Sequence, residues 1–320
     1  MYQTTIGKEL DQAKALLERG ELVSIPTETV YGLAANGFNA VAIAKIYEAK
    51  NRPQFNPLIL HVANLAQAER LVTEMPDACK RLMQSLSPGP ITYLLPKSTL
   101  VPDMVTAGSA RVAIRIPAHP MALELLTMLD FPLAAPSANP SGYVSPVSAM
   151  HVFEGLQGKI RYILDGGSCT IGLESTIVGF EEDEVVIHRL GGITAEQIST
   201  ITGAEVKTSL AHASPTAPGQ LKSHYATTKP LLIGNVQQLI NAFPGKKIGL
   251  LMFNQSAGLA VEKEILLSPS GSLGEAAAGL FRAMRLLDQS DLDVIIAQRF
   301  PDTGIGRAIN DRLERAAYKS

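Results

Sequence analysis

Hydroxyl, carboxylate and basic groups that could hold an anion are concentrated near the start of the chain. Residues 26–33 read Pro-Thr-Glu-Thr-Val-Tyr-Gly-Leu and directly follow an apolar run at residues 22–25. An apolar run that stops at a proline predicts a buried strand, and the loop after such a strand presents polar groups at the edge of a pocket. Residues 26–33 are therefore the first candidate for a functional site.

Two cations, Lys50 and Arg52, follow a segment with helical periodicity. The pattern predicts a helix over residues 40–50, with Asn39 as its N-cap and Pro53 as its stop. Cations at a helix end can simply complement the helix dipole and remain solvated. Because prolines stiffen the backbone after them, a rigid basic loop facing the hydroxyl-rich loop predicts instead an anion site.

A later strand carries two arginines on one face. Residues 111–116 alternate so that Arg111, Ala113 and Arg115 share a side, because side chains repeat with period two along a strand. Four residues at ~3.3 Å each separate the arginines by about 13 Å. They belong either to a solvated sheet face or to a site where each captures one of two anionic parts of a ligand, for which guanidinium is well suited.

Further polar side chains follow apolar runs later in the chain. Residues 137–145 are rich in serine, proline and glycine and come after the buried run at residues 133–135. Such a cluster either closes turns or contacts a ligand. Ser175 is either a strand-edge hydroxyl or a ligand contact, and Glu174 could neutralise an arginine as easily as bind a ligand. His61, at the end of a predicted strand, is either a core histidine or a ligand contact.

Residues 207–230 lack clear periodicity and contain several proline and glycine turns. We place the domain boundary there, with an N-terminal domain at residues 1–207, a linker at 208–229 and a C-terminal domain at 230–320. Beyond the boundary, short apolar runs alternate with helical stretches, which is typical of a small parallel-sheet α/β domain. The predicted strands are residues 231–233, 248–252 and 294–297, and the predicted helices are residues 273–287 and 306–319.

The composition limits the class of protein. With 320 residues, of which 46% are hydrophobic, the chain has room for about two packed domains. A net charge of −2 argues against a broadly basic nucleic-acid-binding surface. The sequence has neither an apolar run of membrane length nor the pattern of a signal peptide, so we expect a cytoplasmic protein without membrane contact.

The common catalytic and metal-binding motifs are missing. The sequence contains no Walker phosphate loop, dinucleotide fingerprint, zinc-protease helix or nucleophile elbow. Cys79 and Cys169, the two cysteines, are too far apart in sequence for a CxxC metal knuckle, and we expect both to be buried or half-buried thiols. The acidic residues 181–184 lie between two strand-like runs and predict a hairpin tip rather than a metal site. We therefore expect no metal held by the protein alone.

Taken in order, these segments and several others resemble the YrdC-type domain of the threonylcarbamoyl-AMP synthase family. They cover roughly the first two thirds of the chain, and so many ordered motifs are poorly explained by coincidence. Residues 214–226 resemble the linker of the long, two-domain members. The matching segments are residues 26–33, 50–53, 56–58, 87–92, 111–117, 135–142, 165–167, 174–178 and 189–192.

The resemblance implies a fold and an activity. The fold is α/β, with a twisted mixed sheet and helices around a concave cavity in the N-terminal domain, and a small parallel, Rossmann-like sheet in the C-terminal domain. The activity is that of a nucleotidyltransferase, L-threonylcarbamoyladenylate synthase, which joins L-threonine, bicarbonate or carbon dioxide, and ATP into threonylcarbamoyl-AMP and releases pyrophosphate. Magnesium is expected with the ATP. The product passes to enzymes that form threonylcarbamoyladenosine in tRNA, and a direct contact to tRNA is left open.

The matching motifs carry residue roles over to this chain. Lys50 and Arg52 are expected on the phosphates, and Arg115 on the carboxylate of threonine. No general base is assigned, because the amine can lose its proton to water or bicarbonate. The expected threonine contacts are Thr29, His61, Arg115, Ala135 and Ser175. The expected ATP contacts are Lys50, Arg52, Asn56, Arg111, Ser137, Ser145, Arg189 and Tyr225.

His224 and Tyr225 match linker positions that fold back over the nucleotide in the long family members, which would make residues 220–226 a lid. Ser223 stands where the family has an arginine, so the charge of that position is missing. A regulator bound by the C-terminal domain is a weaker possibility, and the sequence offers no site residues for it. Two other classes are considered: an RNA-binding module without catalysis, and a carbamoyl transferase of metal-centre maturation, against which the two isolated cysteines argue.

Overall fold

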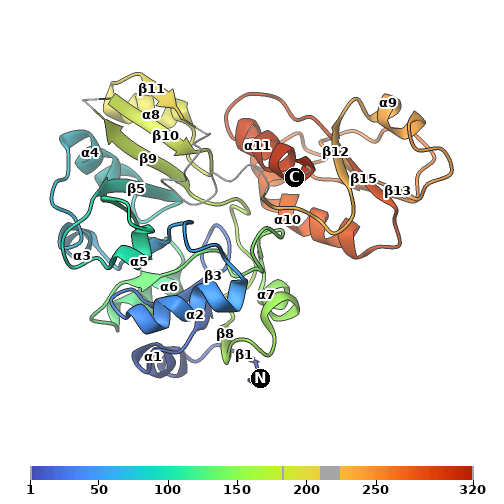
Figure 1. Ribbon diagram of the computed structural model, residues 1–320. Coiled ribbons are helices and arrows are strands. Elements are labelled where there is room, and N and C mark those ends of the chain that lie inside the picture. Colours follow the sequence, from blue (N-terminus) through green and yellow to red (C-terminus); the bar gives the residue numbers. More distant parts are fainter. Residues whose placement is uncertain (1, 182–183, 210–223, 319–320) are drawn as a thin grey trace.

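The structure is a computed structural model of the chain, and it describes residues 2–181, 184–209 and 224–318. These residues form two α/β parts, each built on its own sheet. Figure 1 shows the N-terminal part, coloured from blue to yellow, beside the C-terminal part in orange and red. None of the described helices is both long enough and apolar enough to cross a membrane.

In the described residues, eleven strands form the mixed sheet of the N-terminal part, in the order β1-β8-β2-β3-β7-β4-β6-β5-β9-β10-β11. The strands are β1 Thr5–Gly7, β2 Val23–Ile25, β3 Gly32–Asn36, β4 Ile59–His61, β5 Ile91–Pro96, β6 Arg111–Arg115, β7 Leu133–Ala134, β8 Tyr162–Leu164, β9 Thr176–Glu181, β10 Glu184–Arg189 and β11 Val206–Thr208. The helices are α1 Leu10–Glu18, α2 Ala40–Lys50, α3 Leu65–Glu69, α4 Asp77–Leu86, α5 Asp103–Thr106, α6 Pro120–Thr127, α7 Ala149–Leu156 and α8 Ala195–Thr202.

The register of the central strands explains how distant segments meet. Strands β4 and β6 are parallel, and His61 is the Cα partner of Arg115. Because parallel strands present their carboxyl ends at the same edge of a sheet, the last residues of both strands lie together. An isolated bridge between Gly32 and Ser137 also brings the start of β3 and the loop after β7 together. Four segments with polar side chains therefore converge.

Strand β6 has the two faces that its alternation predicts. Val112 and Ile114 belong to the large apolar core, whereas Ala113 belongs to a separate small cluster of buried residues. Since side chains two residues apart share a face, Arg111 and Arg115 lie on the side of Ala113. The predicted alternation is confirmed.

Helix α2 forms where its pattern predicts. The Asn39 side chain accepts hydrogen bonds from the backbone N–H groups of Val41 and Ala42, which satisfies two donors that a helix start leaves open. The helix ends at Lys50, and Asn51 follows in the left-handed conformation with φ 50°. Because this cap turns the chain sharply, the side chains of Lys50 and Arg52 lie in different surroundings.

The C-terminal part has the predicted parallel sheet, with strands in the order β12-β15-β13-β14. The elements predicted there are confirmed, with ends that differ by one or two residues. The bounds are β12 Leu231–Gly234, α9 Val236–Asn241, β13 Ile248–Met252, β14 Lys263–Leu266, α10 Leu273–Gln289, β15 Val294–Gln298 and α11 Gly306–Ala317. A mixed sheet followed by a small parallel sheet is the fold class expected from the sequence.

Three smaller expectations concern the cysteines, the acidic turn and the linker. Cys79 and Cys169 are both buried thiols, as predicted. Strands β9 and β10 pair as an antiparallel hairpin whose two ends are Glu181 and Glu184, and residues 182–183 lie outside the described residues. The same holds for residues 210–223, which form most of the predicted linker and the first part of the predicted lid.

Helix α10 packs closely on the N-terminal part. A Cβ at Gly172, whose φ is +73°, would lie 2.5 Å from the Cα of Ala278, so this approach requires a glycine. From the same helix, Arg285 donates a hydrogen bond of 2.5 Å to the carbonyl oxygen of Val144. Buried apolar residues of both parts form one continuous cluster. The C-terminal part therefore supports loops that belong to the N-terminal part.

Candidate active site

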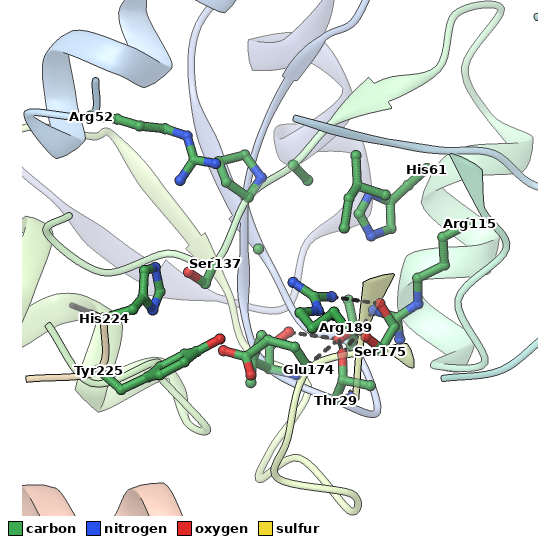
Figure 2. A pocket seen from close by; sticks show the side chains of 16 residues that line it. Thr29, Arg52, His61, Arg115, Ser137, Glu174, Ser175, Arg189, His224 and Tyr225 are labelled. Carbon is green, nitrogen blue, oxygen red and sulfur yellow. Dashed lines mark hydrogen bonds between the residues drawn. The ribbon is translucent and has the colours of Figure 1, made fainter. Parts of the chain in front are cut away.

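A cavity of about 50 Å³ lies where the loops of the N-terminal sheet meet His224 and Tyr225 of the predicted linker. Polar side chains from widely separated segments form its wall, and Figure 2 shows how they point toward one another. In that view one group lies to the right and consists of Thr29, His61, Arg115 and Ser175. A second group lies to the left and consists of Arg52, Ser137, His224 and Tyr225.

Arg115 and Thr29 contact each other directly. The guanidinium of Arg115 donates through Nη1 to the Thr29 hydroxyl at 2.8 Å and through Nη2 to Glu28 Oε1 at 2.6 Å. Its Nε donates to the carbonyl oxygen of Gly89 at 3.2 Å. Glu28 is the carboxylate that allows a buried arginine here, since an unpaired charge in the interior is costly. The sequence prediction included Arg115 and Thr29 but missed Glu28.

His61 lies beside Arg115 and carries no charge near neutral pH. Burial lowers its pKa, with a further contribution from the charge of Arg115, to about 3. Its Nδ1 atom is buried and has no hydrogen-bond partner among the described residues. Buried polar atoms are normally paired. A neutral imidazole with an unsatisfied nitrogen at the cavity wall is suited to a polar group of a ligand.

Arg189 and Ser175 form the next contact along the wall. The Arg189 guanidinium donates through Nε to the Ser175 carbonyl oxygen at 3.0 Å and through Nη2 to the Ser175 hydroxyl at 2.9 Å. That hydroxyl is also within 2.7 Å of the Thr92 hydroxyl. A Cβ at Gly191 would lie 2.3 Å from the carbonyl oxygen of Glu174. Gly191 therefore lets the segment that follows Arg189 approach the backbone around Ser175.

Arg52 lines the cavity, and Asn56 holds it from behind. Arg52 donates through Nη2 to Asn56 Oδ1 at 2.7 Å and to the Pro57 carbonyl oxygen at 2.8 Å. Burial lowers the pKa of Arg52 to about 10, so the guanidinium remains charged at neutral pH. Asn56 was expected to contact ATP, but it is not part of the cavity wall. Its side-chain oxygen orients Arg52, and its expected contact with ATP stays a prediction.

Lys50 lies outside the cavity wall. Its ammonium donates to the carbonyl oxygen of Ser137 at 2.5 Å and to that of Asn139. Burial lowers its pKa well below the usual range, and the charges of Arg52 and Lys159 act in the same direction. In this conformation Lys50 ties α2 to the loop after β7. Its expected contact with the phosphates stays a prediction.

The structure separates the two arginines of β6. Arg111 is half-exposed and donates through Nη1 to Glu181 Oε1 at 2.7 Å, at the far end of the strand. It is not part of the cavity wall, whereas Arg115 is. A β-strand with period two places both on one face, but it does not place them in one pocket. The expected contact of Arg111 with ATP stays a prediction.

Ala135 and Ser137 line the cavity, whereas Ser145 reaches it only through Glu174. The Ser145 hydroxyl donates to Glu174 Oε1 at 2.6 Å. Burial raises the pKa of Glu174, but the charges of Arg312 and Arg189 outweigh that effect and lower it to about 2. Glu174 is therefore an ionised carboxylate in the wall of the cavity.

Arg312 of α11 is the residue that sequence reasoning missed most clearly. Its Nε donates to Glu174 Oε2 at 2.9 Å, and its Nη2 donates to the carbonyl oxygen of Leu190 at 2.7 Å. Sequence reasoning named no site residue in the C-terminal domain. The sequence held one signal of a special role for Arg312, because this charged residue interrupts the buried apolar stripe of α11 between Ala308 and Ala316.

The described end of the linker closes one side of the cavity. His224 and Tyr225 both belong to its wall, and Tyr225 is buried with a left-handed φ of 63°. Its ring stacks on Phe281 of α10 with centroids 5.4 Å apart, and the Arg312 guanidinium lies 5.1 Å from its centroid. Burial lowers the pKa of His224 to about 3. Contacts with Phe281 and Arg312 of the C-terminal part therefore hold the Tyr225 ring in the cavity wall.

The arrangement favours binding of an anion over covalent chemistry. Three buried arginines line the cavity and face one lining carboxylate, Glu174. No group of three or more His, Cys, Asp or Glu residues that could hold a metal occurs in the described part of the chain. Guanidinium groups, hydroxyls and a neutral imidazole can position a charged substrate and offset developing charge.

Comparisons with known proteins agree with this geometry. A family model described as "Telomere recombination" matches residues 15–191, and another described as "Threonylcarbamoyl-AMP synthase, C-terminal domain" matches residues 193–318. The threonylcarbamoyl-AMP synthase of Bacillus subtilis (strain 168) is 43% identical over 326 residues, which cover 98% of this chain and 94% of that protein. That of Pyrococcus abyssi is 39% identical over 321 residues, covering 95% and 93% respectively.

The likeness extends to the three-dimensional structure. The crystal structure of P. abyssi Sua5 complexed with L-threonine matches with a TM-score of 0.91 and 36% identity, and covers 99% of this chain and 97% of that chain. The match therefore spans both sheets. The chain belongs to the threonylcarbamoyl-AMP synthase family.

Proposed function

We propose that the protein is an L-threonylcarbamoyladenylate synthase, which converts L-threonine, bicarbonate or carbon dioxide, and ATP into threonylcarbamoyl-AMP and pyrophosphate. Membership of the family over nearly the whole chain supports this activity. The observation that carries it is the convergence of buried Arg52, Arg115 and Arg189 on one cavity beside neutral His61. Such a cavity matches substrates that carry a carboxylate and a triphosphate.

The threonine site is proposed at the end of the cavity that contains Arg115. The guanidinium would pair with the carboxylate, and the hydroxyls of Thr29 and Ser175 would accept or donate to the polar groups of the amino acid. His61 would offer its unpaired nitrogen to the threonine hydroxyl or amine, and the backbone at Ala135 completes this end. The relative from P. abyssi was solved with L-threonine, which supports an amino-acid site in this fold.

The reaction proceeds in two bond-forming steps. The threonine ammonium first loses a proton, and the free amine adds to carbon dioxide to give a carbamate. One carbamate oxygen then attacks the α-phosphorus of ATP as the bond to the β-phosphate oxygen breaks and pyrophosphate leaves. Positioning and charge neutralisation carry the catalysis, because phosphoryl and nucleotidyl transfer leave little covalent work for a side chain. The proton acceptor is not assigned to a residue.

The ATP site is proposed at the other end of the cavity, around Arg52, Ser137, Arg189 and Tyr225. A cavity of about 50 Å³ is far smaller than the roughly 300–1,000 Å³ of ordinary ligand pockets, so ATP requires a more open state. The linker end at His224 and Tyr225 is the proposed lid, since both rings lie in the cavity wall. Four further expected ATP contacts lie outside the wall of this small cavity and stay proposals: Lys50, Asn56, Arg111 and Ser145.

Magnesium is proposed to arrive on the triphosphate. The two carboxylates next to the cavity are already paired, Glu28 with Arg115 and Glu174 with Arg312. The described residues therefore do not offer magnesium a site of their own, and we assign no step to it. Downstream, we propose that the product serves threonylcarbamoyladenosine formation in tRNA, which implies an enzyme that accepts threonylcarbamoyl-AMP.

The RNA-binding alternative is less well supported. A protein that binds RNA needs exposed cations along its surface. Arg52, Arg115 and Arg189 are instead buried and hydrogen-bonded within the protein. The net charge of −2 points in the same direction.

Pyrophosphate release by the purified protein, with and without L-threonine and bicarbonate, tests the proposal. Release that requires both substrates, with threonylcarbamoyl-AMP identified by mass spectrometry, is expected. Release without threonine, or none at all, would contradict it. Tight and salt-sensitive tRNA binding in the absence of turnover would favour the RNA-binding alternative.

A further inference from the structure

One carboxylate of helix α10 connects two chain segments that lead to the cavity wall. Asp288 is 5% exposed, and its Oδ2 accepts a hydrogen bond from the Tyr143 hydroxyl at 2.8 Å. Its Oδ1 accepts from the Thr228 hydroxyl at 2.8 Å and from the backbone N–H of Lys229 at 3.0 Å. Burial raises the pKa of Asp288, but these hydrogen bonds outweigh that effect and lower it. The carboxylate is therefore charged at neutral pH.

The first of these segments is the loop after β7, which contains Tyr143 and whose Ser137 lines the cavity. Helix α10 holds this loop at more than one point. Arg285 donates a hydrogen bond to the carbonyl oxygen of Val144, and its guanidinium lies 4.8 Å from the centroid of the Tyr143 ring. From the other side, Lys50 donates to the carbonyl oxygen of Ser137. The loop is therefore fixed between α2 and α10.

The second segment, residues 226–229, directly follows Tyr225. The backbone N–H of Ala226 donates to the carbonyl oxygen of Gly142 at 2.8 Å. Ala226 also pairs with Tyr143 in an isolated parallel bridge. The two segments therefore lie side by side, and the bonds of Asp288 join them from the side of α10.

Tyr225 depends on this support because of its backbone conformation. Its φ of 63° lies in the left-handed region, which is rare for a bulky residue. Such a conformation carries strain and persists only where the surrounding structure holds it. The Tyr225 ring lines the cavity, as Figure 2 shows, and stacks on Phe281 of α10. Phe281 thus holds the ring, and Asp288 of the same helix holds the backbone that follows it.

We propose that Asp288 is a positioning residue of the nucleotide site: by binding residues 226–229 to the loop after β7, it keeps Tyr225 in the cavity wall, where the ring retains ATP. The contact with ATP is made by Tyr225, and Asp288 acts through it. This inference rests on the proposed function, since it takes ATP as the ligand at this end of the cavity. It gives helix α10 a role in how long ATP stays bound.

The test measures the release of a fluorescent ATP analogue from the full-length protein by stopped-flow displacement. Asp288→Ala removes the three hydrogen bonds to Tyr143, Thr228 and Lys229. It is expected to speed release about fivefold. The affinity for L-threonine should change less than about twofold, because a local effect on one segment leaves a site on other segments independent. The matched control is Asp291→Ala, which removes an exposed ion pair with Lys247 just past the same helix and should leave the release rate unchanged.

Two further variants separate positioning from general support. In the Tyr225→Ala background, Asp288→Ala should change the release rate less than about 1.5-fold, because effects that pass through one residue do not add. Asp288→Asn should stay within about 1.5-fold of the unchanged protein, because its amide can accept from Thr228 and Lys229 and donate to the Tyr143 hydroxyl.

Variants of the partners cover the case in which Asp288→Ala does not fold. Tyr143→Phe and Thr228→Val each remove one of the hydrogen bonds to Asp288. Each should speed release about two- to threefold. Unchanged release in both would count against the inference.

Four results with the Asp288 variants would overturn it. Folded Asp288→Ala could release ATP as slowly as the unchanged protein, its effect could be as large in the Tyr225→Ala background, threonine affinity could fall by the same factor, or Asp288→Asn could be as fast as Asp288→Ala. Failure of the proposed function looks different. The unchanged protein would then bind the ATP analogue but release no pyrophosphate with threonine and bicarbonate, and the release rates would still decide the role of Asp288.

Discussion

The guanidinium of Arg115 and the hydroxyl of Thr29 lie 2.8 Å apart, although 86 residues separate them in sequence. The contact exists because β6 ends beside β4 while the loop after β2 passes over the same edge of the sheet. Both side chains face the cavity (Figure 2). This contact joins the two segments of the proposed threonine site and makes Arg115 the first residue to test.

Arg115→Met should weaken L-threonine binding by about 1.5–3 kcal/mol, the usual range for a charge-assisted hydrogen bond, which is about 10- to 150-fold. It also leaves Glu28 buried without its partner, which costs stability. The double variant Arg115→Met/Glu28→Gln should restore stability but not threonine affinity, as measured by calorimetry and chemical unfolding. Arg161→Met is the control, since Arg161 is exposed and contacts Tyr2. Unchanged threonine affinity in the double variant would contradict the assigned role.

Acid should destabilise the protein partly through Glu174. Its pKa is lowered from 4.5 to about 2 in the folded protein, so its contribution is present above pH 4.5 and is lost as pH falls from 4.5 towards 2. A pKa lowered by about two and a half corresponds to about 3 kcal/mol in the free energy of unfolding.

The free energy of unfolding in urea, measured between pH 7 and pH 3, should therefore fall more steeply for the unchanged protein than for Glu174→Gln. Glu69→Gln, which removes an exposed carboxylate on α3, serves as the control and should follow the unchanged protein. Parallel pH curves for the unchanged protein and the Glu174 variant would refute this prediction.

Tyr225→Ala should speed the release of ATP about tenfold by removing the ring that closes the cavity. The ring now stacks on Phe281 and lies in the cavity wall. Stopped-flow displacement of a fluorescent ATP analogue gives the dissociation rate. Tyr318→Ala is the control, because Tyr318 is exposed at the chain end. A release rate equal to that of the unchanged protein would show that Tyr225 does not act as a lid over ATP.

Gly191→Ala should disturb the site from behind. The added Cβ would lie 2.3 Å from the Glu174 carbonyl oxygen and 2.4 Å from the Thr176 backbone nitrogen, so the backbone around Ser175 must move. Overpacking of this kind costs about 1–3 kcal/mol. We expect a lower melting temperature and weaker threonine binding. Gly274→Ala, whose Cβ would meet only the Ser272 hydroxyl at 3.7 Å, should be neutral. Equal effects of both substitutions would show that the contact is unimportant.

Local patterns determine much of the fold. The N-cap at Asn39 and the length of α2 follow from helical spacing and capping chemistry. The two faces of β6 follow from period-two alternation, and the parallel C-terminal sheet follows from apolar runs that alternate with helices. In each case the determining contacts lie within a few residues, so the sequence can be interpreted directly.

The sequence by itself determined which polar segments matter, because their types and order match one family. Only the tertiary structure decided which side chains share the cavity. It places Arg115 in the wall but turns Arg111 toward Glu181, and it ties Lys50 to carbonyl groups. It also brings Arg312 from the second sheet to Glu174. The physical reason is that strand register and packing between distant segments set these contacts, and neither follows from local periodicity.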